Sequence, residues 1–217
     1  MKKIIFSVLL TTAFCVSASA QDEKFIKAME PKVIAIDTIR KSEELIALSA
    51  SFERIADAEK TKWHPYYYAA LAQVNAAYSF GENIKAEKTD PMADKAEALI
   101  NKADALSPNN SEIYVVKKMI ASLRMMADPM NRWQTYGPQA EQALQTAMKL
   151  NPENPRVYVL QAQDKYFTPE QFGGSKTEAK KLFEEANKKF ASFKPSSTIE
   201  PNWGRPSVAY FLAELNK

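Results

Sequence analysis

Apolar residues recur every three or four positions along most of the chain, which is the spacing of amphipathic helices. This pattern predicts helices over 23–40, 43–60, 65–80, 91–106, 111–127, 138–150, 155–167, 176–192 and 206–216. The sequence has no convincing run of alternating apolar and polar residues bounded by turn signals, the pattern typical of strands. It therefore predicts an all-α fold.

Several predicted helices carry a recognisable start signal. Asn154-Pro155 and Asp90-Pro91 each place a capping residue before a proline, which is tolerated at the first helical position. Ser175 and Glu178 fit a capping box, in which hydroxyl and carboxylate satisfy free backbone N–H groups. Pro31 is expected to split or kink the first helix.

A hydrophobic-x-proline motif recurs at a nearly constant interval. Its prolines are Pro65, Pro108, Pro152 and Pro195, which lie 43, 44 and 43 residues apart. Each interval holds two predicted helices. The chain is therefore expected to be a repeat protein built from helix pairs.

The two central repeats resemble the tetratricopeptide repeat, or TPR. The resemblance is carried by two matching strings, Ala96-x-x-x-Ile100-x-x-Ala103-x-x-Leu106-x-Pro108 and Ala140-x-x-x-Leu144-x-x-Ala147-x-x-Leu150-x-Pro152. It implies a right-handed solenoid of antiparallel helix pairs, with three to four repeats. The stretches 59–68 and Asn202-Trp203-Gly204 are similar to those of short exported TPR proteins of Gram-negative bacteria with no assigned activity.

The expected organisation follows from these marks. An N-terminal helical cap or degenerate repeat covers 21–64, repeats cover 65–107, 108–151 and 152–194, and a capping helix covers 206–216. A TPR has about 34 residues, so each repeat here has about ten more. The surplus is expected in long loops between paired helices, at 81–90, 128–137 and 168–175, lying side by side along one edge of the array.

The first twenty residues read as a cleavable secretory signal. Lys2 and Lys3 precede an apolar run over 4–14, and Ala18-Ser19-Ala20 supplies small residues before a mature start at Gln21. The mature protein is thus expected to be periplasmic or secreted, without a transmembrane segment. Lipidation at Cys15 is disfavoured because the preceding residue, Phe14, is large.

Charge and cysteine content narrow the possible functions. The chain has 29 basic and 26 acidic residues, and loss of Lys2 and Lys3 leaves 27 basic residues and a net charge of +1. The sequence lacks the stripe of basic residues that would indicate a nucleic-acid partner. Cleavage after Ala20 also removes the only cysteine, which excludes disulfides and thiol catalysis.

No constellation predicts catalysis, a metal site or a cofactor. His64 is the only histidine and is expected to cap a helix or face solvent. Gly173-Gly174-Ser175 lacks the remaining residues of a phosphate loop and reads as a turn with an N-cap. The carboxylates show no spacing typical of a catalytic pair. The chain is therefore expected not to be an enzyme.

The main functional hypothesis is a scaffold that binds a peptide or protein partner. Its groove would use Tyr66, Tyr68, Lys117, Arg124 and Lys165, and its loop edge Trp133, Tyr136 and Phe172. The alternative is a small-molecule or glycan binder with an aromatic pocket in the same fold. Met119, Met125, Met126 and Met130 are expected to fill the core, and Trp203 to pack under the last helix.

Overall fold

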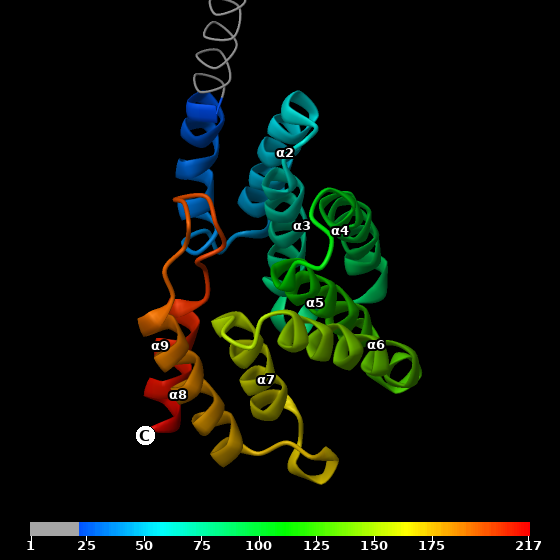
Figure 1. Cartoon of the computed structure of the whole chain (residues 1–217). Helices are drawn as coiled ribbons and strands as arrows, with labels where there is room; N and C mark the ends of the chain where they lie inside the picture. The colour runs from blue at the N-terminus through cyan, green and yellow to red at the C-terminus, as the bar shows by residue number, and fades with distance from the viewer. Residues whose placement is uncertain (1–21) are drawn as a thin grey trace, which may run out of the picture.

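The computed structural model describes residues 22–217, so the predicted secretory signal and Cys15 lie outside the described residues. Within that range the fold is all-α, as predicted. A first helix covers 22–35 and continues through Pro31. It is followed by α2 (Ser42–Glu59), α3 (Trp63–Tyr78), η1 (Gly81–Asn83), α4 (Ala86–Leu106), α5 (Ser111–Ala127), α6 (Pro129–Leu150), α7 (Pro155–Phe167), η2 (Glu170–Phe172), α8 (Lys176–Ser192) and α9 (Arg205–Leu215). Neighbouring helices pack on one another in a layered array (Figure 1).

The helix starts follow from their capping residues. The Asn110 and Asn154 side chains accept hydrogen bonds from the backbone N–H groups two residues later, each at 3.0 Å. The Ser175 hydroxyl accepts one from the Glu178 backbone N–H at 3.2 Å, which is one half of the predicted capping box. The other half is absent, because the Ser175 N–H donates to the Lys165 carbonyl at 2.9 Å. The helices that begin after these residues, α5, α7 and α8, have the predicted bounds.

The predicted long loops are wrong for two of the three positions. Residues 86–90 belong to α4 and residues 129–137 belong to α6, which makes these helices 21 and 22 residues long. Pro91 and Pro138, the first residues of two predicted helices, both lie inside the observed helices. The surplus residues of these repeats therefore lengthen helices, and only 168–175 remains largely a loop.

The lengthened ends of α4 and α6 support each other. The Arg132 guanidinium of α6 donates two hydrogen bonds to the Asp90 carboxylate of α4, at 2.7 and 2.8 Å. Bidentate arginine–carboxylate pairs fix geometry as well as adding energy. The hydrogen bond from Arg132 lowers the pKa of Asp90, although partial burial opposes this effect. This contact stabilises the turns of both helices that precede their internal prolines.

The core is centred on α3. Tyr67, Tyr68 and several alanines of this helix are fully buried, and small residues let neighbouring helices approach closely. Buried hydroxyls also tie helices together, because Ser49 donates to the Ala69 carbonyl at 2.9 Å and Ser111 to the Ala147 carbonyl at 2.8 Å. A second, smaller cluster around Phe183 and Phe190 joins α7, α8 and α9.

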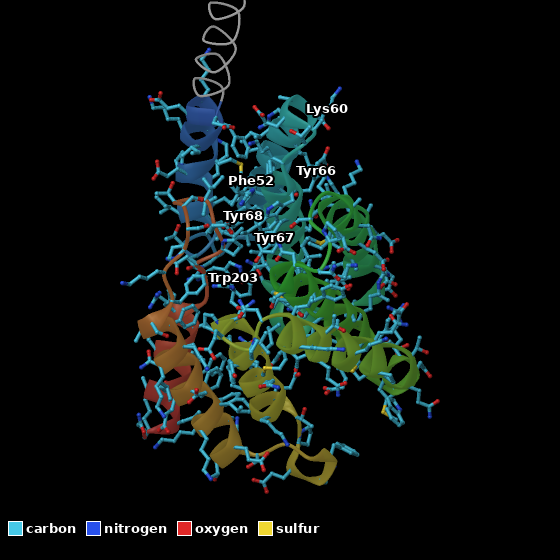
Figure 2. The ribbon with its side chains drawn as sticks, viewed as in Figure 1. Phe52, Lys60, Tyr66, Tyr67, Tyr68 and Trp203 are labelled. Atoms are coloured by element: carbon cyan, nitrogen blue, oxygen red, sulfur yellow. The ribbon has the colours of Figure 1, made fainter. Side chains whose placement is uncertain are left out.

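A segment near the C-terminus closes the core over α3. We call residues 193–204 the strap; it leaves α8, passes beside the first helix and returns to α9 (Figure 1). The Tyr68 hydroxyl donates to the Ile199 carbonyl at 3.0 Å, and the Trp203 indole N–H donates to the Tyr67 hydroxyl at 2.8 Å. Figure 2 shows Trp203 below the tyrosines of α3. Trp203 thus packs against α3 and not under the last helix as predicted.

The strap ends at a position that requires glycine. Gly204 has φ +103, a conformation that side chains rarely adopt, and an added Cβ would lie 3.4 Å from the Phe190 ring. Its N–H donates to the Asp37 carboxylate at 3.3 Å. The strap is therefore fixed to the segment that follows the first helix as well as to α3.

Beneath the strap lies a buried ion pair. Arg156 has no exposed surface, and its guanidinium donates to both carboxylate oxygens of Glu112. The rings of Phe193 and Trp203 cover it, with centroids 4.8 and 5.9 Å from Cζ. Burial alone would lower the pKa of Arg156, but the Glu112 carboxylate raises it overall. The pair thus joins α5, α7 and the strap.

Removing one member of this pair should be costly. We expect Glu112→Ala to lower the free energy of unfolding by about 3 kcal/mol, because it leaves the Arg156 charge buried without a partner. Urea denaturation followed by circular dichroism would measure the change. Lys27→Ala is the control, since Lys27 forms an exposed pair with Glu23 and its loss should leave stability unchanged. Equal stability of both variants would contradict the prediction.

Asp37 should give stability a distinct pH dependence. Burial raises the pKa of Asp37 from its usual 3.8, and the Gly204 N–H, Arg40 and Arg156 only partly offset this. The folded state therefore keeps a proton that the unfolded state has lost, so this carboxyl's contribution to stability falls as pH rises through the raised pKa. Asp37→Asn keeps an acceptor for Gly204 without the titration. We expect the free energy of unfolding of the variant, relative to that of wild type, to increase between about pH 3 and pH 7. Urea denaturation at several pH values would measure it. A difference between the two proteins that stays constant with pH would contradict this.

Candidate functional site

The first candidate site is a groove of about 400 Å³ between α4 and α6, with α5 as its floor. We call it the central groove. It is lined by Glu97, Ile100 and Asn101 of α4, by Tyr114, Lys117, Ile120, Ala121 and Arg124 of α5, and by Gln139, Gln142, Ala143 and Thr146 of α6.

The helical repeat of α5 places its groove residues in one stripe. Tyr114, Lys117, Ala121 and Arg124 follow one another at intervals of three or four residues, so they share a face. Lys117 and Arg124 are seven residues apart, which separates their backbone positions by about 10 Å along the helix. Ala121 lies between them and leaves room above the floor. The groove therefore has two cations flanking a small apolar centre.

Acidic side chains hold both cations. Arg124 contacts Asp94 at 2.7 Å and Glu97 at 2.8 Å, while Lys117 contacts Asp104 at 2.6 Å. Burial alone would lower the pKa of Arg124, but its hydrogen bond to Asp94 and the nearby carboxylates raise it overall. Asp94 and Glu97 remain 69% and 56% exposed. Ion pairs with exposed partners contribute little to stability, so a ligand carboxylate can replace these partners at small cost.

The structure brings three of the predicted site residues together. Lys117 and Arg124 line the central groove, and the Tyr136 ring lies 5.9 Å from the Arg124 guanidinium. Tyr114, which was not among the predicted site residues, also lines this groove, and the Lys117 Nζ lies 5.0 Å from the centroid of its ring. Its i+3 spacing from Lys117 could have identified it.

Tyr66 and Tyr68 are not on an open groove. Tyr66 is 9% exposed and its hydroxyl donates to the Ala56 carbonyl, while Tyr68 is fully buried against Phe52 and the strap (Figure 2). The strap and α2 cover the surfaces on which a partner was expected. These two tyrosines hold the core together.

The remaining predicted residues are dispersed. Trp133 and Phe172 are 57% and 73% exposed, but Trp133 lies on helix α6 and not on a loop. Lys165 pairs with Glu178 at 2.7 Å and donates to the Gly173 carbonyl at 3.2 Å. These contacts hold the 168–175 turn against α7 and α8, which gives Lys165 a structural role.

Two further expectations need correction. His64 is only 13% exposed, stacks on Trp63 at 4.0 Å and places Nε2 3.0 Å from the Glu200 carboxylate, so it does not face solvent. Among the methionines predicted to fill the core, Met119 is buried, whereas Met126 and Met130 are 45% and 85% exposed.

A second groove, of about 480 Å³, lies between the first helix and α2. We call it the N-terminal groove. It is lined by Lys24, Phe25, Ala28 and Lys32 of the first helix and by Ser51, Arg54, Ile55, Ala58 and Glu59 of α2. Sequence reasoning missed it. The four-residue spacing of Lys24, Ala28 and Lys32 puts them on one helical face, but such a pattern usually indicates a solvated surface.

Two general features of the described structure bear on function. No helix within 22–217 is both long and apolar enough to cross a membrane. Nor do the residues of that range bring three His, Cys, Asp or Glu side chains together in a way that could hold a metal ion.

Comparison with known proteins gives a family. No protein-family model and no curated protein matches the chain. Among solved structures, the HusA haemophore from Porphyromonas gingivalis is similar, with a TM-score of 0.76 and 34% sequence identity. The match covers 88% of this chain and 92% of that one. The chain therefore belongs to the family of the HusA haemophore.

Proposed function

We propose that this protein binds haem or a closely related tetrapyrrole in the central groove, as an exported binding protein and not as an enzyme. The observation that carries the proposal is the 34% identity to a haemophore over nearly the full length of both chains. The export step rests on the predicted secretory signal over 1–20. The helix pairs are proposed to form a TPR-like solenoid.

The lining of the central groove suits the ring of such a ligand. Tetrapyrroles are flat and apolar across the ring, and small-molecule sites use apolar walls with a few placed polar groups. Tyr114 and Ala143 are partly exposed in the groove, with Ile100 and Ile120 buried beneath them. Ala121 and Ala143 are small enough to admit a flat body between α4 and α6. Haem would thus lie above the α5 floor.

The carboxylates of haem would meet the two cations of the stripe. Lys117 and Arg124 have side chains 27% and 12% exposed, so they are partly withdrawn from water yet open to the groove. Carboxylates bind ammonium and guanidinium groups by charge-assisted hydrogen bonds. In binding, Lys117 would exchange Asp104 for the ligand, and Arg124 would exchange Asp94 or Glu97.

The iron would contribute little to this mode of binding. His, Met, Cys and Tyr are the side chains that commonly hold haem iron, and Tyr114 is the only one of them in the groove lining. Lys117 lies over the Tyr114 ring. Recognition in this groove is therefore proposed to depend on the ring and its carboxylates.

The relationship to a haemophore favours the small-molecule alternative over the predicted peptide or protein partner. The burial of Tyr66 and Tyr68 also argues against a peptide partner, because these two residues were expected to contact it and are not accessible. Lys117, Arg124 and Tyr136 remain in the proposed site.

The two cations can be tested directly. We expect Lys117→Gln with Arg124→Gln to weaken haem binding at least about tenfold, which corresponds to about 1.4 kcal/mol, because the ligand carboxylates lose their partners. Absorbance titration in the Soret region would measure the dissociation constants. Lys27→Gln is the matched control. Unchanged affinity in the double variant would exclude the central groove as the site.

The role of iron can be tested with a metal-free ligand. Because the groove offers few iron ligands, protoporphyrin IX without metal should bind within about threefold of haem. Quenching of intrinsic tryptophan fluorescence can follow both ligands. A loss of about a hundredfold on removing the metal would show that iron ligation dominates and would overturn this binding mode.

A further inference from the structure

We infer that the N-terminal groove is a second binding site, which takes an anionic amphiphile with a slender acyl chain and a carboxylate or phosphate head. This inference goes beyond the proposed tetrapyrrole site, because it concerns a different surface with a different charge arrangement.

The cations of the N-terminal groove have no acidic partner. Lys24, Lys32 and Arg54 form no ion pair within residues 22–217, and residues 1–21 contain no Asp or Glu. Lys32 donates to the Ala28 carbonyl at 3.1 Å and Arg54 to the Ser51 hydroxyl at 2.9 Å, so both have only neutral acceptors. The cations of the central groove, in contrast, are each held by carboxylates. The N-terminal groove therefore offers uncompensated positive charge.

The floor between these cations is apolar. Phe25 and Ala28 of the first helix face Ile55 of α2 across the groove. Ala28 lies midway between Lys24 and Lys32 on one helical face, so its short side chain leaves a trough between the two long ones. Lysine and arginine stems can cover an apolar chain while their charged ends remain at the surface.

The shape of the groove favours a slender ligand. Its walls come from two helices, the first helix and α2, whereas the central groove has three. Phe25 is 4% exposed, so it offers little ring surface on which a flat ligand could stack. A trough along the junction of two helices fits an extended acyl chain better than a tetrapyrrole disc.

Charge complementarity identifies the head group. Three cations and a single lining acid, Glu59, give the groove a net charge of +2. A carboxylate or phosphate at the end of the chain would be bound by charge-assisted hydrogen bonds. A cationic or neutral head would gain nothing from these side chains.

Calorimetric titration of the purified protein would test the site, with oleate and dodecyl phosphate, each below its critical micelle concentration, as the two probes. Dodecyltrimethylammonium controls for the apolar chain alone. We expect both anions to bind wild type, and the triple variant Lys24→Gln, Lys32→Gln, Arg54→Gln to bind them at least about tenfold more weakly. Lys27→Gln, on the same helix but paired with Glu23, should bind as wild type does.

A second variant changes the shape of the N-terminal groove and leaves its charge unaltered. Ala28→Trp keeps every cation but fills the trough, and should abolish binding of both anions while circular dichroism shows the fold intact. Three results would overturn the inference. They are failure of wild type to bind either anion, binding of both anions by the triple variant as tightly as by wild type, and binding of the ammonium probe as tight as that of the anions.

The same variants distinguish this inference from the proposed function. Haem titration of the triple variant should give the wild-type dissociation constant, whereas the Lys117 and Arg124 variant should lose haem but retain oleate. Loss of haem and oleate together in the triple variant would show one shared site in the N-terminal groove, and would overturn the inference of a separate acyl site.

Discussion

The buried Arg156 guanidinium sets the strictest constraint on this structure. A charge removed from water must be compensated by a partner with good geometry, and Glu112 supplies it from the neighbouring helix pair. The rings of Phe193 and Trp203 then exclude water from the same site. This one site therefore constrains α5, α7 and the strap together, because a shift of any of them would leave the Arg156 charge buried without its partner.

This constraint also decides which surfaces remain open. Once the strap lies over α3, the tyrosines beneath it serve the core and are not available to a ligand. The central groove is bounded by other helices, α4, α5 and α6, and the N-terminal groove by the first helix and α2. They differ chiefly in how their cations are paired. Carboxylates of the protein pair with the cations of the central groove, whereas the cations of the N-terminal groove have no acidic partner within residues 22–217.

Local sequence signals predicted local structure well. Asn110, Asn154 and Ser175 act on backbone groups only two or three residues away, so their caps could be read from the sequence. Asp90-Pro91 was a misleading helix-start signal, because the Asp90 carboxylate binds Arg132 of another helix and α4 already begins at Ala86. The strap was missed for the same reason. Its prolines resembled another repeat boundary, whereas its conformation depends on Tyr67 and Tyr68, more than a hundred residues earlier.

The bond between Gly204 and Asp37 joins residues 167 positions apart. Most helix pairs form from neighbouring segments, but the layer over α3 needs both ends of the chain at once. Contacts of such sequence separation form slowly, since the loop entropy is lost before the contact is gained. During folding, the paired helices would therefore form first, and α3 would stay uncovered until residues 199–204 reach it. The last step of folding would be the burial of Tyr67, Tyr68 and Arg156 together.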